Sequence, residues 1–195
     1  MSKILVVANQ KGGVGKTTTA VNLSASLAAT KRKVLMVDLD PQGNATMGSG
    51  IDKHDLELSL YDVLTGNRKV ADAILVAENA GYDILPTNSD LTAAEVELMN
   101  MPQRETRLRS ALGEVSANYD YIIIDCPPSL SMLTVNAMVA AQGVLIPMQC
   151  EYYALEGLSA LMQTIEKIKA NLNPELEIEG ILRTMYDPRN SLTTD

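Results

Sequence analysis

The sequence has very few aromatic residues and contains neither tryptophan nor phenylalanine. Aromatic residues make up 4% of the 195 residues, whereas the hydrophobic share of 46% is ordinary for a globular protein. The core must therefore be built from aliphatic side chains and methionine, which is common in parallel-sheet folds. A chain of this length can bury a sizeable core but is short for two, so we expect one domain over residues 1–195.

Residues that form disulfide frameworks or zinc sites are also scarce. The chain has two cysteines, Cys126 and Cys150, and one histidine, His54, with no clustered partners. We expect both cysteines to be small buried residues in a reducing compartment. The first residues lead straight into an apolar strand without a signal-peptide pattern, and no run approaches the roughly 18 apolar residues of a membrane span. These absences predict a cytoplasmic protein with no membrane partner.

The net charge of −8 argues against a protein that coats itself in nucleic acid by bulk charge. Any contact with DNA would need a local basic patch. One basic run is present, at Arg104, Arg107 and Arg109 on a predicted helix. Such a run is usually a solvated face, and its functional interpretation is an anionic partner.

A glycine-rich stretch is the centre of the predicted site. An apolar run over residues 4–8 leads into it, a helical pattern over 18–29 leaves it, and strand, glycine-rich loop and helix in this order form the phosphate-binding arrangement. Glycines allow successive N–H groups to point at an anion, and the positive end of the helix adds to the field. The predicted nucleotide-binding residues are Lys11, Gly12, Gly13, Val14, Gly15, Lys16, Thr17 and Thr18.

Within this loop, Lys16 is expected to reach the β- and γ-phosphates of ATP, and the Thr17 hydroxyl to hold Mg²⁺. The pattern is a variant, because Gln10 stands where the ordinary motif begins with glycine. A second lysine, Lys11, follows. Two lysines this close repel each other unless a highly charged anion lies between them or Lys11 serves the nucleotide of another subunit. We favour the second option, which predicts an ATP-bridged homodimer; a solvated loop charge is the alternative for Lys11.

Strand and helix patterns alternate along the chain and predict an α/β fold, a doubly wound, mostly parallel sheet with helices on both faces. The expected strands cover residues 4–8, 34–37, 82–86, 121–124, 144–147 and 178–185. The expected helices cover residues 18–29, 58–64, 70–76, 91–99, 102–115, 133–141 and 155–170, the fifth of them starting at Pro102. Because the chain stops soon after a strand with no helix to cover it, we expect a shortened form of a longer protein.

Carboxylates follow two of the predicted strands. Asp38 and Asp40 come after the second strand, and Asp125 ends the continuous apolar strand over 121–124. Chemistry in open parallel sheets gathers at the carboxyl ends of the strands, so these carboxylates should face the phosphates. An acid at the end of a buried strand after such a loop is the Walker B arrangement, which binds Mg²⁺ directly or through water.

Four segments together resemble the ParA/Soj family of chromosome and plasmid partition ATPases. They are KGGVGKTT, VDLDPQGN over 37–44, YIIIDCPPSL over 121–130 and QCEYYALEGL over 149–158. The first is shared by the wider deviant-Walker-A superfamily, and the last is more specific to chromosomal ParA proteins. The resemblance covers essentially the whole chain, although family proteins usually extend some sixty residues further.

The resemblance implies roles for individual residues. Lys11 corresponds to the signature lysine that crosses the dimer interface, Asp40 to the residue that orients the attacking water, and Asp125 to the Walker B acid. Asp38 would help shape the Mg²⁺ shell, in which Thr17, Asp40 and Asp125 are the expected ligands. Family members bind ATP and Mg²⁺, dimerise, bind DNA non-specifically on the nucleoid and hydrolyse ATP slowly until a ParB/Spo0J-like partner stimulates them. Arg189 stands where family members place a DNA-contacting arginine.

Three other interpretations stay open. A MinD-like membrane switch would need an amphipathic terminal helix. An electron carrier like the nitrogenase iron protein would need cluster cysteines on both sides of the Walker B region, and no cysteine precedes Asp125. A metabolic ligase or kinase on the same fold would need a pocket for a small acceptor.

Overall fold

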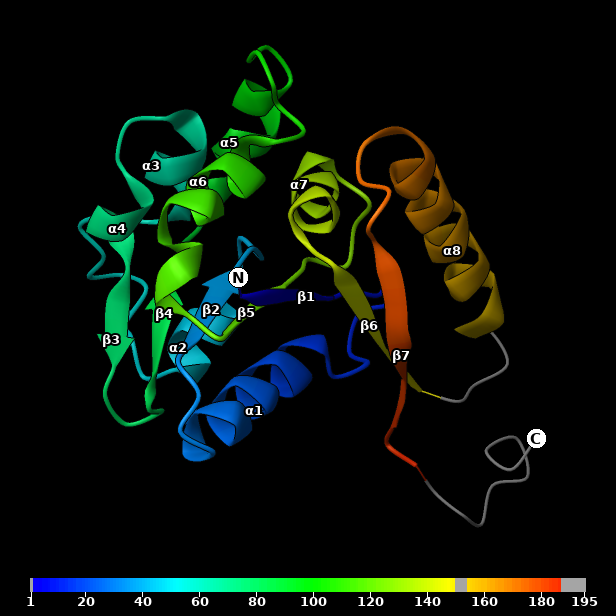
Figure 1. Cartoon of the computed structure of the whole chain (residues 1–195), viewed down its shortest axis with the longest axis horizontal. Coiled ribbons are helices and arrows are strands. Elements are labelled where there is room, and N and C mark those ends of the chain that lie inside the picture. The colour runs from blue at the N-terminus through cyan, green and yellow to red at the C-terminus, as the bar shows by residue number, and fades with distance from the viewer. Residues whose placement is uncertain (1, 150–153, 187–195) are drawn as a thin grey trace.

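A computed structural model describes residues 2–149 and 154–186. Its centre is a seven-stranded sheet with the strand order β3-β4-β2-β5-β1-β6-β7 (Figure 1). All neighbouring strands run parallel except β3 and β4, which are antiparallel. The sheet consists of β1 Lys3–Val7, β2 Val34–Asp38, β3 Leu75–Ala77, β4 Tyr82–Leu85, β5 Tyr121–Asp125, β6 Gly143–Gln149 and β7 Glu177–Thr184.

The central strands are apolar on both sides because helices cover both faces of the sheet. Ile4 and Val6 of β1 pack into one core cluster, whereas the alternating Leu5 and Val7 pack into the other. Aliphatic runs therefore replace the polar alternation of a half-exposed sheet, as parallel sheets require. This confirms the predicted doubly wound α/β fold.

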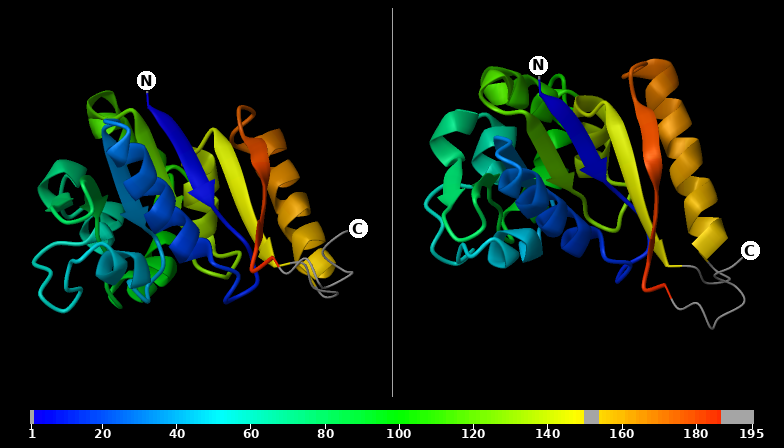
Figure 2. Two further views of the ribbon diagram at one scale, coloured as in Figure 1. Left: turned by 90° about the horizontal axis from the view of Figure 1, so that it is seen from below. Right: turned by 60° about the horizontal axis from the view of Figure 1, so that its bottom comes forward.

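The two helical layers are unequal, as Figures 1 and 2 show. The helices α1 Lys16–Ala29 and α2 Asn44–Gly48 lie on the face that carries Leu5 and Val7. The other helices are α3 Leu60–Thr65, α4 Val70–Ala73, α5 Leu91–Leu98, α6 Arg107–Val115, α7 Met132–Ala140 and α8 Ala154–Asn171, and a short 3₁₀ helix covers Ser116–Asn118. The larger core that these helices form is aliphatic, with Leu60, Leu108 and Leu112 fully buried.

Two predicted helices differ from the structure. The helix expected from Pro102 begins at Arg107 instead, because residues 101–106 form turns and the buried Asn136 fixes the later start. The Asn136 side chain accepts a hydrogen bond from the backbone N–H of Leu108 and donates one to the carbonyl of Arg104. Arg104 therefore lies before the helix, and only Arg107 and Arg109 of the basic run are helical.

The helix expected over 70–76 ends at Ala73, and the residues after it form the edge strand β3. Local apolar periodicity cannot separate these outcomes, because a short apolar segment fits either a helix or a strand, and the antiparallel pairing of Val76 with Asp83 in the next strand decides the matter. The short helix α2 was not predicted; it follows a turn at Gly43, whose φ is 62°. Within residues 2–149 and 154–186, no helix is long and apolar enough to cross a bilayer.

Candidate functional site

The glycine-rich loop connects the end of β1 at Val7 to the start of α1 at Lys16. Gly13 and Gly15 have φ angles of 73° and 86°, in the region that L side chains rarely adopt. A side chain at Gly13 would meet no atom within 4 Å, so glycine is needed there for backbone conformation and not for space. These two residues let the loop turn back over the end of the sheet.

The amino terminus of α1 has no side-chain cap. Gly15 is the N-cap residue and makes no side-chain hydrogen bond to the first turn. The first turn of α1 contains the backbone N–H groups of Lys16, Thr17 and Thr18. N–H groups in the first turn of an α-helix have no hydrogen-bond acceptor within the helix. An uncapped helix start that follows a glycine loop is suited to bind an anion such as a phosphate.

The Lys16 side chain lies across the loop. Its ammonium donates a hydrogen bond of 2.9 Å to the carbonyl oxygen of Lys11, and the residue is only 7% exposed. Burial lowers the pKa of the Lys16 ammonium, while the carboxylates of Asp125 and Asp40 act to raise it. The ammonium is therefore held against the backbone of the loop, close enough to Asp125 and Asp40 for their charges to act on it.

Two polar residues, one at the start of the loop and one in β7, fix the position of the loop. The Asn9 side chain donates to the carbonyl of Pro147 in β6 at 2.7 Å and accepts from the backbone N–H of Lys11 at 3.0 Å. From β7, the Thr184 hydroxyl donates to the carbonyl of Val14 at 2.9 Å. The methyl group of Thr184 would lie 3.6 Å from a Cβ at Gly15. The loop is thus tied to the strands at one end of the sheet.

Asp38 and Asp125 lie side by side at the carboxyl ends of β2 and β5, where they are register partners. On the other side of β5, the pairing with β1 places Val7 opposite Asp125, so the loop that follows Val7 starts next to the two acids. Both acids are fully buried. The two strand-end carboxylates therefore lie next to each other and next to the start of the loop, and their expected orientation toward phosphates stays a prediction.

Asp125 carries the least satisfied carboxyl group of the site. Among the described residues, neither of its buried oxygens has a partner in hydrogen-bond geometry, although the Thr17 hydroxyl lies near enough to favour the charged form. The pKa of Asp125 is raised to about 7, mainly by burial and also by the charges of Asp38 and Asp40, against the lowering effects of the Thr17 hydroxyl and Lys16. A buried carboxylate whose oxygens lack partners in hydrogen-bond geometry is a candidate for interaction with a cation or with metal-bound water.

Asp38 has its partners within the protein. One oxygen accepts from both the backbone N–H and the hydroxyl of Thr46, each at 2.7 Å, and the other accepts from the backbone N–H of Asp40 at 3.2 Å. Burial raises its pKa to about 6, against the effect of these hydrogen bonds. The Thr46 hydroxyl in turn accepts from the backbone N–H of Thr87. Asp38 thus organises the segment after β2.

Asp40 lies in the tight turn that this network holds. Its side chain accepts from the backbone N–H of Gln42 at 2.9 Å, and its carbonyl accepts from the N–H of Gly43 at 2.8 Å. A side chain at Gly43 would meet the carbonyl of Thr87 at 2.9 Å, so this turn also needs glycine for close packing. The carboxyl group of Asp40 is buried but remains close enough to Lys16 and Asp125 to influence the pKa of each.

The other predicted residues are placed as follows. Lys11 is half-buried in the loop, Gly12 is exposed, and Val14 is buried against β7. Cys126 is buried and unpaired, as expected, whereas Cys150 and Arg189 lie outside the described residues. Within residues 2–149 and 154–186, no three acidic, histidine or cysteine side chains are grouped as a metal site, so a metal here would need hydroxyl and phosphate oxygens as well.

Sequence reasoning missed Asn9, Thr46 and Thr184. The first two stand beside recognised motifs, and their neutral side chains gave no signal of their own. Thr184 is 169 residues from Gly15 along the chain, and only the sheet order brings β7 to the loop. Glycine-rich loop, buried lysine and strand-end acid on a doubly wound sheet together define a P-loop nucleoside triphosphatase fold.

Comparison with known proteins specifies the family. The model of the AAA domain family matches residues 2–178. The chain is 53% identical to the chromosome partitioning protein ParA of Caulobacter vibrioides over 193 residues, covering 98% of this chain and 72% of that protein. It is 54% identical to the sporulation initiation inhibitor protein Soj of Bacillus subtilis over 192 residues, covering 98% and 76%. The chain belongs to the ParA/Soj family of partition ATPases.

Solved structures share the fold. A structure of cobyrinic acid a,c-diamide synthase from Mycobacterium smegmatis with ADP and magnesium superposes with a TM-score of 0.96 at 42% identity, covering 100% of this chain and 79% of that one. Apo McdA of Cyanothece gives 0.87 at 28% identity, covering 94% and 72%. A plasmid partition protein from Borrelia burgdorferi gives 0.84 at 29% identity, covering 99% and 82%.

Proposed function

We propose that this chain is an ATP-driven switch of the partition type. It binds ATP with Mg²⁺, forms a nucleotide-bridged homodimer, binds DNA non-specifically and hydrolyses ATP slowly until a ParB-like protein stimulates it. One observation carries the nucleotide site: the uncapped start of α1 and the buried Lys16 ammonium lie close to the buried carboxylate of Asp125, which has no partner in hydrogen-bond geometry among the described residues. Positive groups for phosphates thus lie next to a carboxylate for the cation that accompanies them.

The residues present fit a magnesium ion. The buried oxygens of Asp125 have no partner in hydrogen-bond geometry among the described residues, and the Thr17 hydroxyl is the nearby polar group that acts on them. Thr17 would hold the ion directly, and Asp125 and Asp40 would hold it directly or through water. When bound, Mg²⁺ neutralises phosphate charge. Solved structures of the family support this ligand, since the Mycobacterium smegmatis protein contains ADP and magnesium.

The chain's own residues supply position and charge for hydrolysis. Lys16 would exchange its bond to the Lys11 carbonyl for the nucleotide phosphates. Asp40 would accept a hydrogen bond from the attacking water and align it. Lys11 of a partner subunit would neutralise the charge that develops on the transferred phosphoryl group. The arrangement needs the second subunit for completion, which fits low turnover by the isolated chain.

Binding of ATP would favour the dimer, and hydrolysis would release it. Partition relatives support the proposed partners, which are a second copy, nucleoid DNA and a ParB-like activator. The location that follows is the cytoplasm, in association with the nucleoid. Arg189 is retained as a proposed DNA contact on the resemblance alone.

The test is ATP hydrolysis with and without duplex DNA and a ParB-like protein from the same source, together with mass measurement in ATP. We expect a dimer in ATP, a monomer in ADP, and hydrolysis that rises at least fivefold only when DNA and the activator are both present. A rate that ignores both additions, in a protein that still binds ATP, would contradict the switch.

A second candidate is a metabolic ligase, which the likeness to the Mycobacterium smegmatis protein solved as cobyrinic acid a,c-diamide synthase favours. Such an enzyme would transfer the phosphoryl group to a small carboxylic acid before amide formation. ATP turnover that depends on a corrinoid acid and an amine donor, and not on DNA or a protein, would support this candidate over the switch.

A further inference from the structure

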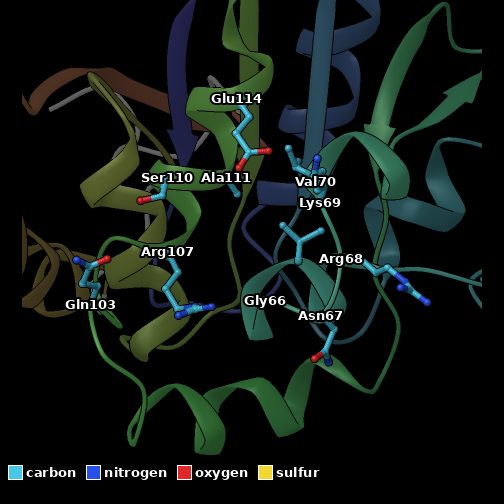
Figure 3. Close-up of a pocket in the computed structure, with 11 residues that line it drawn as sticks. Gly66, Asn67, Arg68, Lys69, Val70, Gln103, Arg107, Ser110, Ala111 and Glu114 are labelled. Carbon is cyan, nitrogen blue, oxygen red and sulfur yellow. The ribbon is translucent and has the colours of Figure 1, made fainter.

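A pocket lies between the turn that joins α3 to α4 and one face of α6 (Figure 3). Its volume is about 430 Å³, in the lower part of the range for small-molecule sites. Arg68, Lys69 and Arg107 line it together with a single acid, Glu114. We call it the basic pocket. This excess of positive charge is notable because the whole chain has a net charge of −8.

Arg107 is held in a fixed position in the basic pocket. Its Nε–H donates to the carbonyl of Leu64 near the end of α3, which anchors the guanidinium group. The same group lies against Gly66, where an added Cβ would be 2.7 Å from the Nη2 atom. Gly66 therefore provides both the left-handed backbone that ends α3 and the space for the guanidinium.

No carboxylate neutralises Arg107 within residues 2–149 and 154–186. By contrast, Arg104 pairs with Glu105 at 2.9 Å, and Lys169 pairs with Glu177 at 2.6 Å. With Nε engaged, the terminal N–H groups of Arg107 remain as donors in a planar fork, which matches two oxygens of one phosphate. A half-buried, anchored arginine without a counterion is suited to an anionic ligand.

Lys69 and Arg68 stand on the exposed rim of the basic pocket. Figure 3 shows the Arg107 guanidinium beside Gly66 and the carboxylate of Glu114 on another side of the pocket. A ligand with phosphate near Arg107 and hydroxyl groups near Glu114 would satisfy both signs of charge. A concave pocket of this size suits a small molecule better than the rigid backbone of a DNA duplex.

We propose that the basic pocket binds a small phosphate-bearing ligand, with Arg107 as the anchoring group and Lys69 as a further cationic contact, whereas the Arg68 side chain is directed away from Arg107 (Figure 3). The pocket is lined by α3, α4 and α6 and shares no lining residue with the glycine-rich loop. It is therefore a site separate from the proposed ATP site, and its occupancy does not depend on the proposed function.

The test uses the NMR resonance of the Arg107 Nε–H group in protein saturated with ADP, so that the glycine-rich loop is already filled. Inorganic phosphate and ribose 5-phosphate are titrated separately, which distinguishes a free anion from a phosphate ester with hydroxyl groups. We expect a saturable shift at millimolar concentrations of at least one of them. No shift with either compound up to 20 mM would overturn the proposal.

Variants test whether binding of the phosphate compound depends on the residues that line the basic pocket or only on the positive charge of this surface. The change Lys69→Gln should weaken the titration at least fivefold, because this exposed residue lines the pocket. Arg109→Gln is the matched control, since Arg109 is an exposed residue of α6 that does not line the pocket. Equal weakening by the control would overturn the proposal, as would a response of Arg107 to a 12-base-pair duplex alone, which would assign the surface to nucleic acid.

Discussion

The ammonium of Lys16 donates to the carbonyl oxygen of Lys11, so the two lysines of the loop are joined through the backbone of one and the side chain of the other. Lys16→Ala removes the buried cation and this bond together. Hydrogen bonds to charged groups contribute about 1.5–3 kcal/mol, which predicts roughly ten- to hundredfold weaker binding of ATP. Titration with a fluorescent ATP analogue measures the loss.

Lys11→Ala is the matched variant, because it keeps the carbonyl that Lys16 contacts. We expect a monomer that binds the analogue within about threefold of the parent chain but no longer gains mass in ATP. Equal loss of nucleotide affinity in both variants would contradict the separate roles of the two lysines.

Asp40→Ala should leave ATP bound and abolish its hydrolysis, because the proposed role of this carboxylate is to align water. The change also removes the hydrogen bond from the N–H of Gln42, at a cost of about 1 kcal/mol in the free energy of unfolding. Asp40→Asn keeps an acceptor for that N–H and serves as the control for folding. Phosphate release and nucleotide affinity are measured on both variants, and hydrolysis at the parental rate in either would refute the role.

The sequence allowed prediction of those parts of the fold that local patterns encode. The runs around Val6, Met36 and Ile123 are continuous and aliphatic, and each forms a central parallel strand. Where tertiary contacts decide, local patterns failed: Asn136 sets the start of α6, and pairing with β4 makes residues 75–77 a strand. Helix and strand patterns of short apolar segments are too similar to resolve such cases.

The candidate site was predictable to a similar extent. The loop and Asp125 follow from motif spacing, and the register of β2 with β5 brings Asp38 beside Asp125. The support of the loop by Thr184 depends on the position of β7 at the sheet edge, and no local signal encodes that contact. The sequence could not indicate the neutral residues that position the loop and the strand-end acids, such as Thr46 beside Asp38.

Asp125→Asn should stabilise the nucleotide-free protein at neutral and alkaline pH. The folded-state pKa of Asp125 is about 7 and its ordinary value is 3.8, so between these values the folded chain keeps a proton that the unfolded chain has released. The free energy of unfolding therefore falls as pH rises through this window. Asparagine does not titrate, so the variant should exceed the parent by about 1–3 kcal/mol at pH 8 and lose that advantage toward pH 4.

Thermal unfolding in EDTA at pH 5 and pH 8 checks this prediction, with Asp90→Asn as an exposed control. A difference between variant and parent that is the same at both pH values would show that Asp125 does not keep its proton in the folded state. The same variant should bind ATP with less dependence on Mg²⁺, because an amide is a weaker ligand for a hard cation than a carboxylate.

Thr184 positions the glycine-rich loop from the far strand of the sheet, and its two functional groups can be tested separately. Thr184→Val keeps the methyl contact with Gly15 but loses the hydrogen bond to the Val14 carbonyl, worth about 1 kcal/mol. The loop supports the bound nucleotide in ground state and transition state alike. The KM for ATP should therefore rise about three- to tenfold while kcat changes less than about twofold.

Thr184→Ser keeps the hydroxyl and removes the methyl group, so its kinetic constants should stay close to those of the parent chain. If Ser raises KM as much as Val does, packing against Gly15 holds the loop and the hydrogen bond is incidental. If both variants lower kcat with unchanged KM, β7 acts on the chemical step and not on nucleotide binding. We expect a raised KM for ATP in Thr184→Val and an unchanged KM in Thr184→Ser. This result arises only if the hydroxyl at the end of β7 sets the conformation in which the loop binds phosphate.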